Sequence, residues 1–214
     1  SWVHDIKAPI TAFALNCENN RDERSRYLLV ENRKVENYVD MALYYARMDA
    51  VYKDYMIAES NLQEVAQQVL LQNKYYLIQS HVKAEVACPD TVYSDKKWIA
   101  FILNQLIQNS VKYGRSEGTH IQIVTKKTKR GVLLRVKDDG IGIPKEELPR
   151  IFEKGFTGTN GRNRERSTGM GLYLCRKLCD KLNIEIRAES AEGKGTEIIL
   201  MFPVSDYLTG YRET

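Results

Sequence analysis

The sequence contains no long apolar segment, no paired cysteine motif and no strong excess of charge of either sign. Its apolar runs fall well short of the roughly 18 residues that a membrane-spanning helix needs, so no span is expected within these 214 residues. None of the four cysteines forms a Cys-x-x-Cys pair, which fits a reducing cytoplasm. The net charge of +4 is spread along the chain and makes no basic stripe of the kind typical of nucleic-acid-binding proteins.

Hydrophobic residues make up 43% of the chain and charged residues 28%, which suits one or two domains with a packed core. Cys175 and Cys179 are one helical turn apart. We expect them to be small apolar side chains on a buried helix face rather than metal ligands. The chain starts at Ser1 rather than at a methionine, shortly before a histidine in a distinctive context. We expect it to be a piece of a longer protein.

An ordered pair of glycine turns is the most informative pattern. Asp138 ends an apolar stretch and leads into Gly140-x-Gly142, and a second pair, Gly169 and Gly171, opens a later apolar helix. Glycines let the backbone approach a phosphate closely, and a helix N-terminus adds oriented N–H donors. A carboxylate can accept a hydrogen bond from an exocyclic amine such as that of adenine. Each pair alone is a turn signal, but together they predict nucleotide binding.

A polar cluster upstream of the glycine turns supports this prediction. Asn109, Lys112 and Tyr113 fall within about one turn of a predicted helix and offer a carboxamide, a cation and an aromatic ring on one face.

The N-terminal part of the chain predicts two helices, at residues 2–19 and 22–50, joined by a polar break. Apolar side chains recur in both at spacings of three and four residues. They are Ile6, Ile10, Phe13 and Cys17 in the first helix and Val35, Tyr38, Ala42 and Tyr45 in the second. One such hairpin buries too little surface, so we expect two copies to form a dimeric four-helix bundle. The alternative is a hairpin that packs only on the rest of its own chain.

The remainder of the chain predicts an α+β fold with helices on one face of a mixed sheet. Helices are expected at residues 61–74, 95–113, 145–153 and 169–182, and strands at 82–87, 121–128, 132–137, 184–189 and 196–202. Asp95 stands where a helix N-cap is expected. Residues 155–168 are polar and glycine-containing and predict a loop. The expected domains are a helical hairpin over 1–57 and an α+β domain over 58–214.

Five segments in this order resemble the H, N, G1, F and G2 boxes of bacterial sensor histidine kinases. They are residues 2–9, 109–113, 138–142, 151–153 and 169–171. The resemblance covers essentially the whole chain. It implies a dimerisation and histidine phosphotransfer hairpin followed by a two-layer α/β sandwich that binds ATP, of the type shared by histidine kinases, Hsp90, gyrase and MutL.

A finer likeness is to the intramembrane-sensing kinases of the bacitracin-resistance type, which work beside peptide-antibiotic ABC transporters. It rests on residues 42–47, 53–55 and 94–98.

By this resemblance His4 is the phosphoryl acceptor, and Asp5 orients its ring and accepts its proton. The apolar stripe of the same helix centres about 150° from His4, so the imidazole is expected to face solvent, within reach of a separate ATP-binding domain. A neutral ring nitrogen can attack the γ-phosphorus. An exposed histidine is ordinarily a solvated surface residue, but the context of residues 2–9 favours the functional role. His81 and His120 have no such context.

The resemblance also assigns a nucleotide pocket. Asn109 would bind Mg²⁺, Lys112 would neutralise phosphate charge and Tyr113 would line the pocket. Asp138 would recognise adenine, with Thr196 as its partner through a water. The other expected contacts are Gly140, Gly142, Gly169 and Gly171, and Arg162, Arg164 and Arg166 of loop 155–168, the expected ATP lid, with Phe152 and Phe156 at its base. For each polar residue alone, an ordinary solvated face is the competing interpretation.

Three positions depart from the family pattern. Gln105 stands where a second asparagine is usual, and Ser167 where many relatives have glycine. Ala8 stands where kinases that also dephosphorylate their regulator place a threonine or asparagine, which orients the attacking water. A methyl group offers no donor or acceptor, so we expect a capable kinase with poor phosphatase activity.

The sequence therefore predicts the cytoplasmic portion of a membrane-anchored sensor histidine kinase. It would use ATP and Mg²⁺ to phosphorylate His4 and pass the phosphoryl group to an aspartate of a response regulator, in cell-envelope or antibiotic-peptide stress sensing. The expected partners are a second copy, a receiver domain and an ABC transporter, with no nucleic acid. Two alternatives stay open: another ATPase of the same fold that forms no phosphohistidine, and a degenerate kinase that serves as a dimeric interaction module.

Overall fold

The computed structural model describes residues 2–20, 22–47, 56–159 and 168–204, with the side chains of residues 2–4 and 47 left out of the description. The chain divides into two compact units. One is Ser1–Asp54 together with Asn73–Gln79, and the other is Tyr55–Gln72 together with Ser80–Thr214. The predicted domain division after residue 57 stays a prediction.

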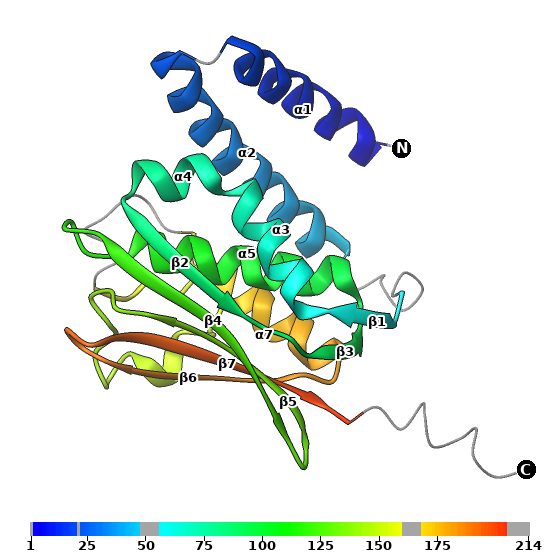
Figure 1. Cartoon of the computed structure of the whole chain (residues 1–214), viewed down its shortest axis with the longest axis vertical. Coiled ribbons are helices and arrows are strands. Elements are labelled where there is room, and N and C mark those ends of the chain that lie inside the picture. The colour runs from blue at the N-terminus through cyan, green and yellow to red at the C-terminus, as the bar shows by residue number, and fades with distance from the viewer. Residues whose placement is uncertain (1, 21, 48–55, 160–167, 205–214) are drawn as a thin grey trace, which may run out of the picture. The chain divides into compact units, whose positions relative to one another are not determined.

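The first unit is a helical hairpin, as predicted, of α1 (Trp2–Asn20) and α2 (Glu23–Arg47) (Figure 1). The two helices are linked at two places. Lys7 Nζ pairs with Asp40 Oδ1 at 2.5 Å, and Asn32 Nδ2 donates to the carbonyl oxygen of Ile10 at 3.1 Å. Pro9 lies inside α1. The short helix α4 (Lys74–Gln79) packs on α2.

The apolar seam predicted on α2 is exposed within the chain. Val35, Tyr38 and Tyr45 are 50%, 47% and 40% exposed, and Phe13 on α1 is 44% exposed. The apolar side chains of α2 that are buried are Leu29, Val30, Met41, Leu43 and Tyr44. The hairpin itself therefore leaves this apolar stripe of α2 largely uncovered.

The second unit contains a five-stranded mixed sheet in the order β2-β4-β5-β7-β6. Its strands are β2 (Val82–Ala87), β4 (Thr119–Thr128), β5 (Gly131–Asp138), β6 (Glu185–Ala191) and β7 (Gly195–Pro203). The β2–β4 pair is parallel and the other pairs are antiparallel. Two further short strands, β1 (Ala58–Asn61) and β3 (Thr91–Ser94), form a separate antiparallel pair.

Three helices form the second layer of this unit: α3 (Leu62–Gln72), α5 (Lys96–Lys112) and α7 (Gly171–Lys181) (Figure 1). Asp95 caps α5, because its side chain accepts from the Lys97 N–H at 2.9 Å, as predicted. Cys175 and Cys179 are fully buried on α7, as expected of small apolar side chains.

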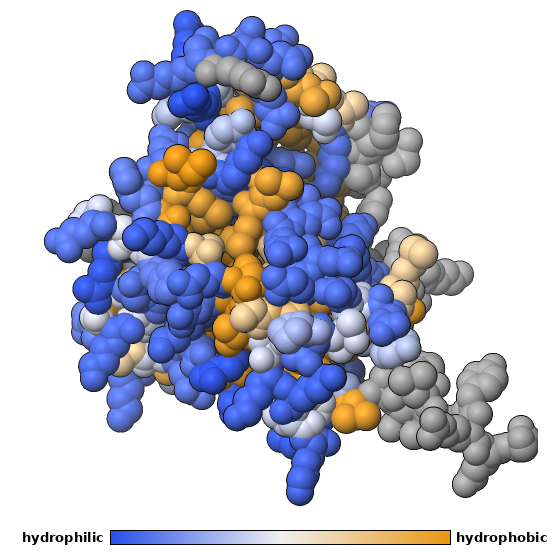
Figure 2. Space-filling model, in the orientation of Figure 1, coloured by the Kyte–Doolittle hydropathy of each residue, from blue (hydrophilic) through white to orange (hydrophobic). Residues whose placement is uncertain are grey.

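The core of this unit lies between the helices and the inward face of the sheet. Its fully buried members include Ile102, Leu103, Leu106 and Ile107 of α5, Leu174 and Leu178 of α7, and Ile121, Ile123, Leu134 and Leu200 of the sheet. On the face drawn in Figure 2 the surface is mainly hydrophilic, with some hydrophobic residues also reaching it. Of the helices in the described ranges, none has the length and hydropathy of a membrane span.

The predicted helix over 145–153 is wrong for most of its length. Only Leu148–Arg150 is helical, as the 3₁₀ turn η1, flanked by turns. Pro149 has no backbone N–H to donate one turn back, and the chain closes instead with short-range bonds such as Arg150 N–H to the Glu147 carbonyl. The sequence-based prediction also omitted β1, β3 and α4.

Candidate functional site

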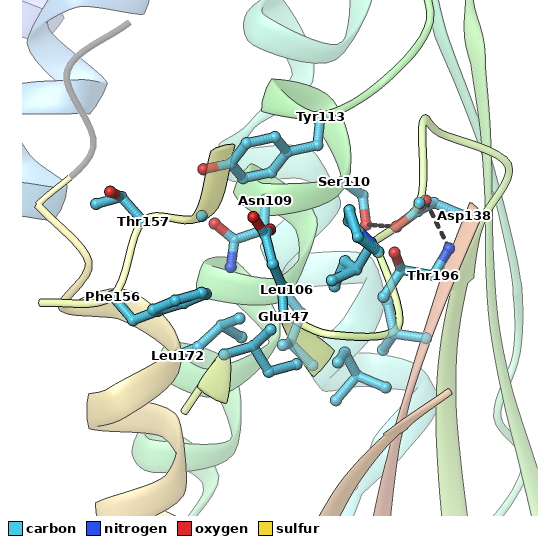
Figure 3. Close-up of a pocket in the computed structure, with 17 residues that line it drawn as sticks. Leu106, Asn109, Ser110, Tyr113, Asp138, Glu147, Phe156, Thr157, Leu172 and Thr196 are labelled. Atoms are coloured by element: carbon cyan, nitrogen blue, oxygen red, sulfur yellow. Dashed lines mark hydrogen bonds between the residues drawn. The ribbon is translucent and has the colours of Figure 1, made fainter. Parts of the chain in front are cut away.

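A pocket opens between α5, the ends of β5 and β7, the turn after β5 and the start of α7 (Figure 3). The space between these elements is about 780 Å³ with open solvent included. The walls are mainly apolar. Their apolar side chains are Leu106, Val136, Ile143, Pro144, Ile151, Phe156, Leu172 and Ile198.

Asp138 is the buried charge of this pocket, with only 9% of its surface exposed. It ends β5, and three elements donate to its carboxylate. Ser110 Oγ of α5 donates to Oδ2 at 2.8 Å, and the Thr196 N–H donates to Oδ1 at 3.2 Å (Figure 3). The Gly140 N–H also donates to Oδ1, at 3.0 Å. The carboxylate is therefore aimed by the helix, the first glycine turn and the neighbouring strand together.

Burial raises the pKa of Asp138 above its usual value, and the nearby Asp139 raises it further. The hydrogen bonds from Ser110, Gly140 and Thr196 act in the opposite direction, because they favour the ionised form. An ionised carboxylate in this buried position is costly, and it is a strong acceptor for a ligand N–H group.

The glycines of the two turns have close neighbours, which are backbone atoms for Gly140, Gly142 and Gly169 and a side-chain oxygen for Gly171. Gly142 has φ +69°, and a Cβ there would lie 2.0 Å from the carbonyl oxygen of Ala191. A Cβ on Gly140 would lie 2.6 Å from the Tyr113 carbonyl oxygen, and one on Gly171 would lie 2.8 Å from Gln105 Oε1. Gly169, at φ +64°, packs against the backbone of Gly155. The first turn thus sits directly on the C-terminal end of α5, and α7 starts over Gln105 in the middle of α5.

The pocket wall opposite Asp138 comes from the segment after η1. Phe156, Thr157 and Gly158 line it, and Glu147 fastens it, because Glu147 Oε1 accepts from Thr159 N at 2.8 Å and from Thr159 Oγ1 at 2.6 Å. Arg150 stacks over the Phe156 ring at 4.7 Å from its centroid. This segment leads into residues 160–167, so Arg162, Arg164, Arg166 and Ser167 lie outside the described residues.

Several predicted site residues meet in this pocket. Asn109, Tyr113, Asp138, Gly142 and Thr196 line it. Gly140, Gly169 and Gly171 shape it through their backbone, and Lys112 is not among the lining residues. Gln105 is buried beneath Gly171 and is also not in the lining.

Sequence reasoning missed Ser110 and Glu147. Ser110 follows Asn109 directly and has an ordinary polar character, so nothing in the pattern marked it as the partner of Asp138. Glu147 fell in the segment predicted to be helical. The proposed water between Thr196 and Asp138 is not tested, but the backbone N–H of Thr196 contacts Asp138 directly.

His4 and Asp5 belong to the other unit. The backbone of His4 is helical in the first turn of α1, and its side chain lies outside the described part. Asp5 is exposed on the same helix.

A two-layer sandwich whose pocket holds a buried carboxylate and is bordered by two glycine turns is typical of one class of ATPase. Residues 94–206 match the family described as "Histidine kinase-, DNA gyrase B-, and HSP90-like ATPase", and the chain belongs to this family. Within it, the chain corresponds to the catalytic region of a sensor histidine kinase. It is 36% identical over 211 residues to the sensor histidine kinase GraS of Staphylococcus aureus strain Mu50, covering 96% of this chain and 60% of GraS. The chain thus spans about 60% of the length of the curated relatives it matches.

Solved structures agree. The match to the catalytic domain of histidine kinase ThkA covers 69% of this chain and 97% of the ThkA domain, with a TM-score of 0.60 and 26% identity. The match to ThkA in its complex with the response regulator protein TrrA covers 96% of this chain and 59% of the ThkA chain, with a TM-score of 0.63 and 20% identity. The two chains therefore share a fold. The predicted fold class and the resemblance to sensor histidine kinases are confirmed.

Proposed function

We propose that this chain is the catalytic core of a membrane-anchored sensor histidine kinase that binds ATP in the pocket at Asp138 and phosphorylates His4. One observation carries the proposal: a buried carboxylate, held by three hydrogen bonds, lies across an apolar pocket from Asn109 and Tyr113. This arrangement suits a flat base with an exocyclic amine at one end and phosphates at the other.

Adenine fits the Asp138 end for a chemical reason. Its N6 amine donates a hydrogen bond, whereas guanine presents a carbonyl oxygen at the corresponding position. A carboxylate oxygen there attracts the first and repels the second. The apolar walls, with Ile143, Leu172 and Phe156, supply the surface on which a base can pack.

Asn109 lies on the wall of the pocket toward the lid segment (Figure 3). We place the phosphates and Mg²⁺ there, because a carboxamide oxygen is a hard ligand that suits this ion. In the described ranges no group of three or more histidine, cysteine, aspartate or glutamate residues is placed to hold a metal. The ion would therefore depend on Asn109, water and the phosphate oxygens, and it would neutralise phosphate charge during transfer.

His4 would act as the nucleophile. A ring nitrogen attacks the γ-phosphorus, the bond from that phosphorus to the oxygen bridging to the β-phosphate breaks, ADP leaves, and Asp5 accepts the ring proton. The phosphoryl group would then pass to an aspartate of a response regulator. The complex of ThkA with TrrA supports a partner of this kind.

The exposed stripe of the hairpin supports homodimerisation. Two copies that bury Val35, Tyr38 and Tyr45 against each other would complete a four-helix bundle. The membrane anchor, a role in cell-envelope or antibiotic-peptide stress and the ABC transporter partner rest on the resemblance to bacitracin-resistance-type kinases, and all three require segments beyond this chain.

The test is labelling with ATP that carries a labelled γ-phosphate. The parent should acquire acid-labile, base-stable label, and His4→Gln should acquire none while keeping its ADP affinity. His120→Gln is the matched control, because that ring pairs with Glu85 at the sheet edge and has no proposed role. Label on His4→Gln, or none on a nucleotide-binding parent, would overturn the assignment and favour an ATPase of another kind. A parent that binds no nucleotide would favour the interaction-module alternative.

A further inference from the structure

Arg115 joins two turns that surround the Asp138 carboxylate. It follows the end of α5 and is exposed. Its Nε donates to the carbonyl oxygen of Asp139 at 2.7 Å, and its Nη2 donates to the carbonyl oxygen of Gly193 at 2.5 Å. One guanidinium thus ties the turn after β5 to the turn between β6 and β7.

The two donors to Asp138 Oδ1 lie in or next to these turns. Gly140 follows Asp139 directly in the first turn, and Thr196 is the second residue of β7, just after the turn that holds Gly193. The turns also bond to each other, since the Gly193 N–H donates to the Ile141 carbonyl oxygen at 2.7 Å. The position of both donors therefore depends on how the two turns sit against each other.

Backbone bonds already hold both turns, and the Ser190 hydroxyl links them by accepting from Ile143 N and donating to the Gly195 carbonyl oxygen. Gly193 and Gly195 have φ of +75° and +89°, and glycine has many accessible conformations. The Ile141 N–H bond to the Tyr113 carbonyl at 3.0 Å anchors the first turn to α5. The Arg115 side chain extends that anchor to the second turn, because a planar fork can reach two acceptors at once.

We propose that Arg115 is a positioning residue for base recognition, which holds the Gly140 and Thr196 N–H groups in place around Asp138. This inference rests on the proposed function, in which Asp138 selects adenine. Arg115 itself does not line the pocket. Its bonds to the two carbonyl groups are exposed to solvent, so they add little to global stability. These bonds act instead on the position of the N–H groups around the Asp138 carboxylate.

The experiment compares Arg115→Ala and Arg115→Lys with the parent by displacement of a fluorescent nucleotide, using ADP and GDP. Arg115→Ala should weaken ADP about tenfold and GDP much less, so that the preference for adenine falls. Arg115→Lys should lie between, because an ammonium group can reach one carbonyl but lacks the fork. In labelling assays Arg115→Ala should raise KM for ATP with little change in kcat. The melting temperature should shift by no more than about 2 °C.

Arg130→Ala is the control, since Arg130 is an exposed arginine paired with Glu185 away from the pocket. Unchanged ADP affinity in Arg115→Ala, or an equal loss for ADP and GDP together with a large fall in melting temperature, would overturn the inference. A comparable loss in Arg130→Ala would also overturn it. A parent that binds no ADP would overturn the proposed function itself. A parent that binds and labels, beside an unaffected Arg115→Ala, would overturn only the role of Arg115.

Discussion

The Ser110 hydroxyl donates to Asp138 Oδ2 at 2.8 Å, so the residue next to Asn109 on α5 directly contacts the carboxylate at the end of β5. Both groups are buried. The helix that carries the proposed phosphate-side ligand and the strand that carries the proposed base acceptor are therefore joined by one side-chain bond. Disturbing it should affect base binding without displacing Asn109.

Ser110→Ala removes this donor and should weaken ADP binding by about 1.5 kcal/mol, roughly tenfold, because the bond is to a charged group. Losing a bond that favours the ionised form also raises the pKa of Asp138 further. The defect should therefore grow as the pH falls from 8 toward 5.5. Calorimetric titration with ADP at several pH values measures this. Ser60→Ala, which removes another buried hydroxyl, on β1 and outside the pocket lining, should leave ADP binding intact.

Asp138→Asn should lose ADP binding and yet stabilise the empty protein at neutral pH. Burial raises the folded-state pKa above the usual value, so the folded state binds more protons between the two values and stability falls as the pH rises through that window. An asparagine removes the charge and keeps the bonds: its oxygen can accept from Gly140 and Thr196, and its amide can donate to Ser110 Oγ.

Thermal melts of Asp138→Asn and the parent from pH 4.5 to 8 check this. The variant should melt higher at pH 8, and its advantage should shrink as the pH falls and the parent's carboxyl takes up a proton. A variant that melts well below the parent at pH 8 would show that the ionised carboxylate is net stabilising.

Gly142→Ala and Gly155→Ala separate backbone strain from steric clash. Both glycines have positive φ, +69° and +75°, so each substitution costs about 1 kcal/mol for that conformation. Only Gly142 has a neighbour in the way, whereas a Cβ on Gly155 meets nothing within 4 Å. Chemical denaturation should therefore show at least about 2 kcal/mol of extra loss for Gly142→Ala. Equal losses would mean that the turn moves easily away from Ala191.

Tyr38→Glu should disrupt the proposed dimer, because it places a charge in the exposed apolar stripe of α2. Sedimentation velocity or light scattering over a range of protein concentrations should show a shift toward monomer. Tyr93→Glu is the control, since Tyr93 is 40% exposed but lies on β3 of the other unit. If Tyr38→Glu stays as dimeric as the parent, the stripe is not the dimer interface.

Ala8→Thr should add phosphatase activity toward a phosphorylated cognate regulator, because a hydroxyl one turn after the Asp5 position can orient a water. Ala8 is exposed on α1, so the change should not disturb packing. The decay of phosphorylated regulator, followed with ADP and with parent or variant, measures it. Strong acceleration by the parent would contradict the expectation that Ala8 leaves this activity poor.

Long periodic segments were predictable from the sequence, because the spacing of their apolar residues shows which side chains are buried. The alternation in β4 and β5 and the cap at Asp95 agree with the structure to within a few residues. Short elements were not. Each four-residue strand of the β1–β3 pair is too short to show a period, and it forms because the other lies beside it. A helix was predicted at 145–153, but Pro149 lacks the N–H that a continuous helix needs there, and only a 3₁₀ turn forms.

The site was predictable where a residue type is unusual for its context. Asp138 at the end of an apolar strand and glycines in a tight turn are of this kind. Ser110 and Arg115 are not, because their roles come from long-range contacts with β5 and with the β6–β7 turn. No local pattern reports which acceptor such a side chain will meet.

The close approach of Gly171 to Gln105 bears on how this chain varies among relatives. A Cβ at position 171 would stand 2.8 Å from Gln105 Oε1, so the long carboxamide and the bare backbone occupy one shared space at the start of α7. The two positions should co-vary, because an alanine at 171 needs either a shorter side chain at position 105 or a Gln105 carboxamide that moves aside. The glutamine at position 105, where relatives usually have asparagine, and the glycine at 171 therefore belong together, because they set how closely α5 and α7 approach.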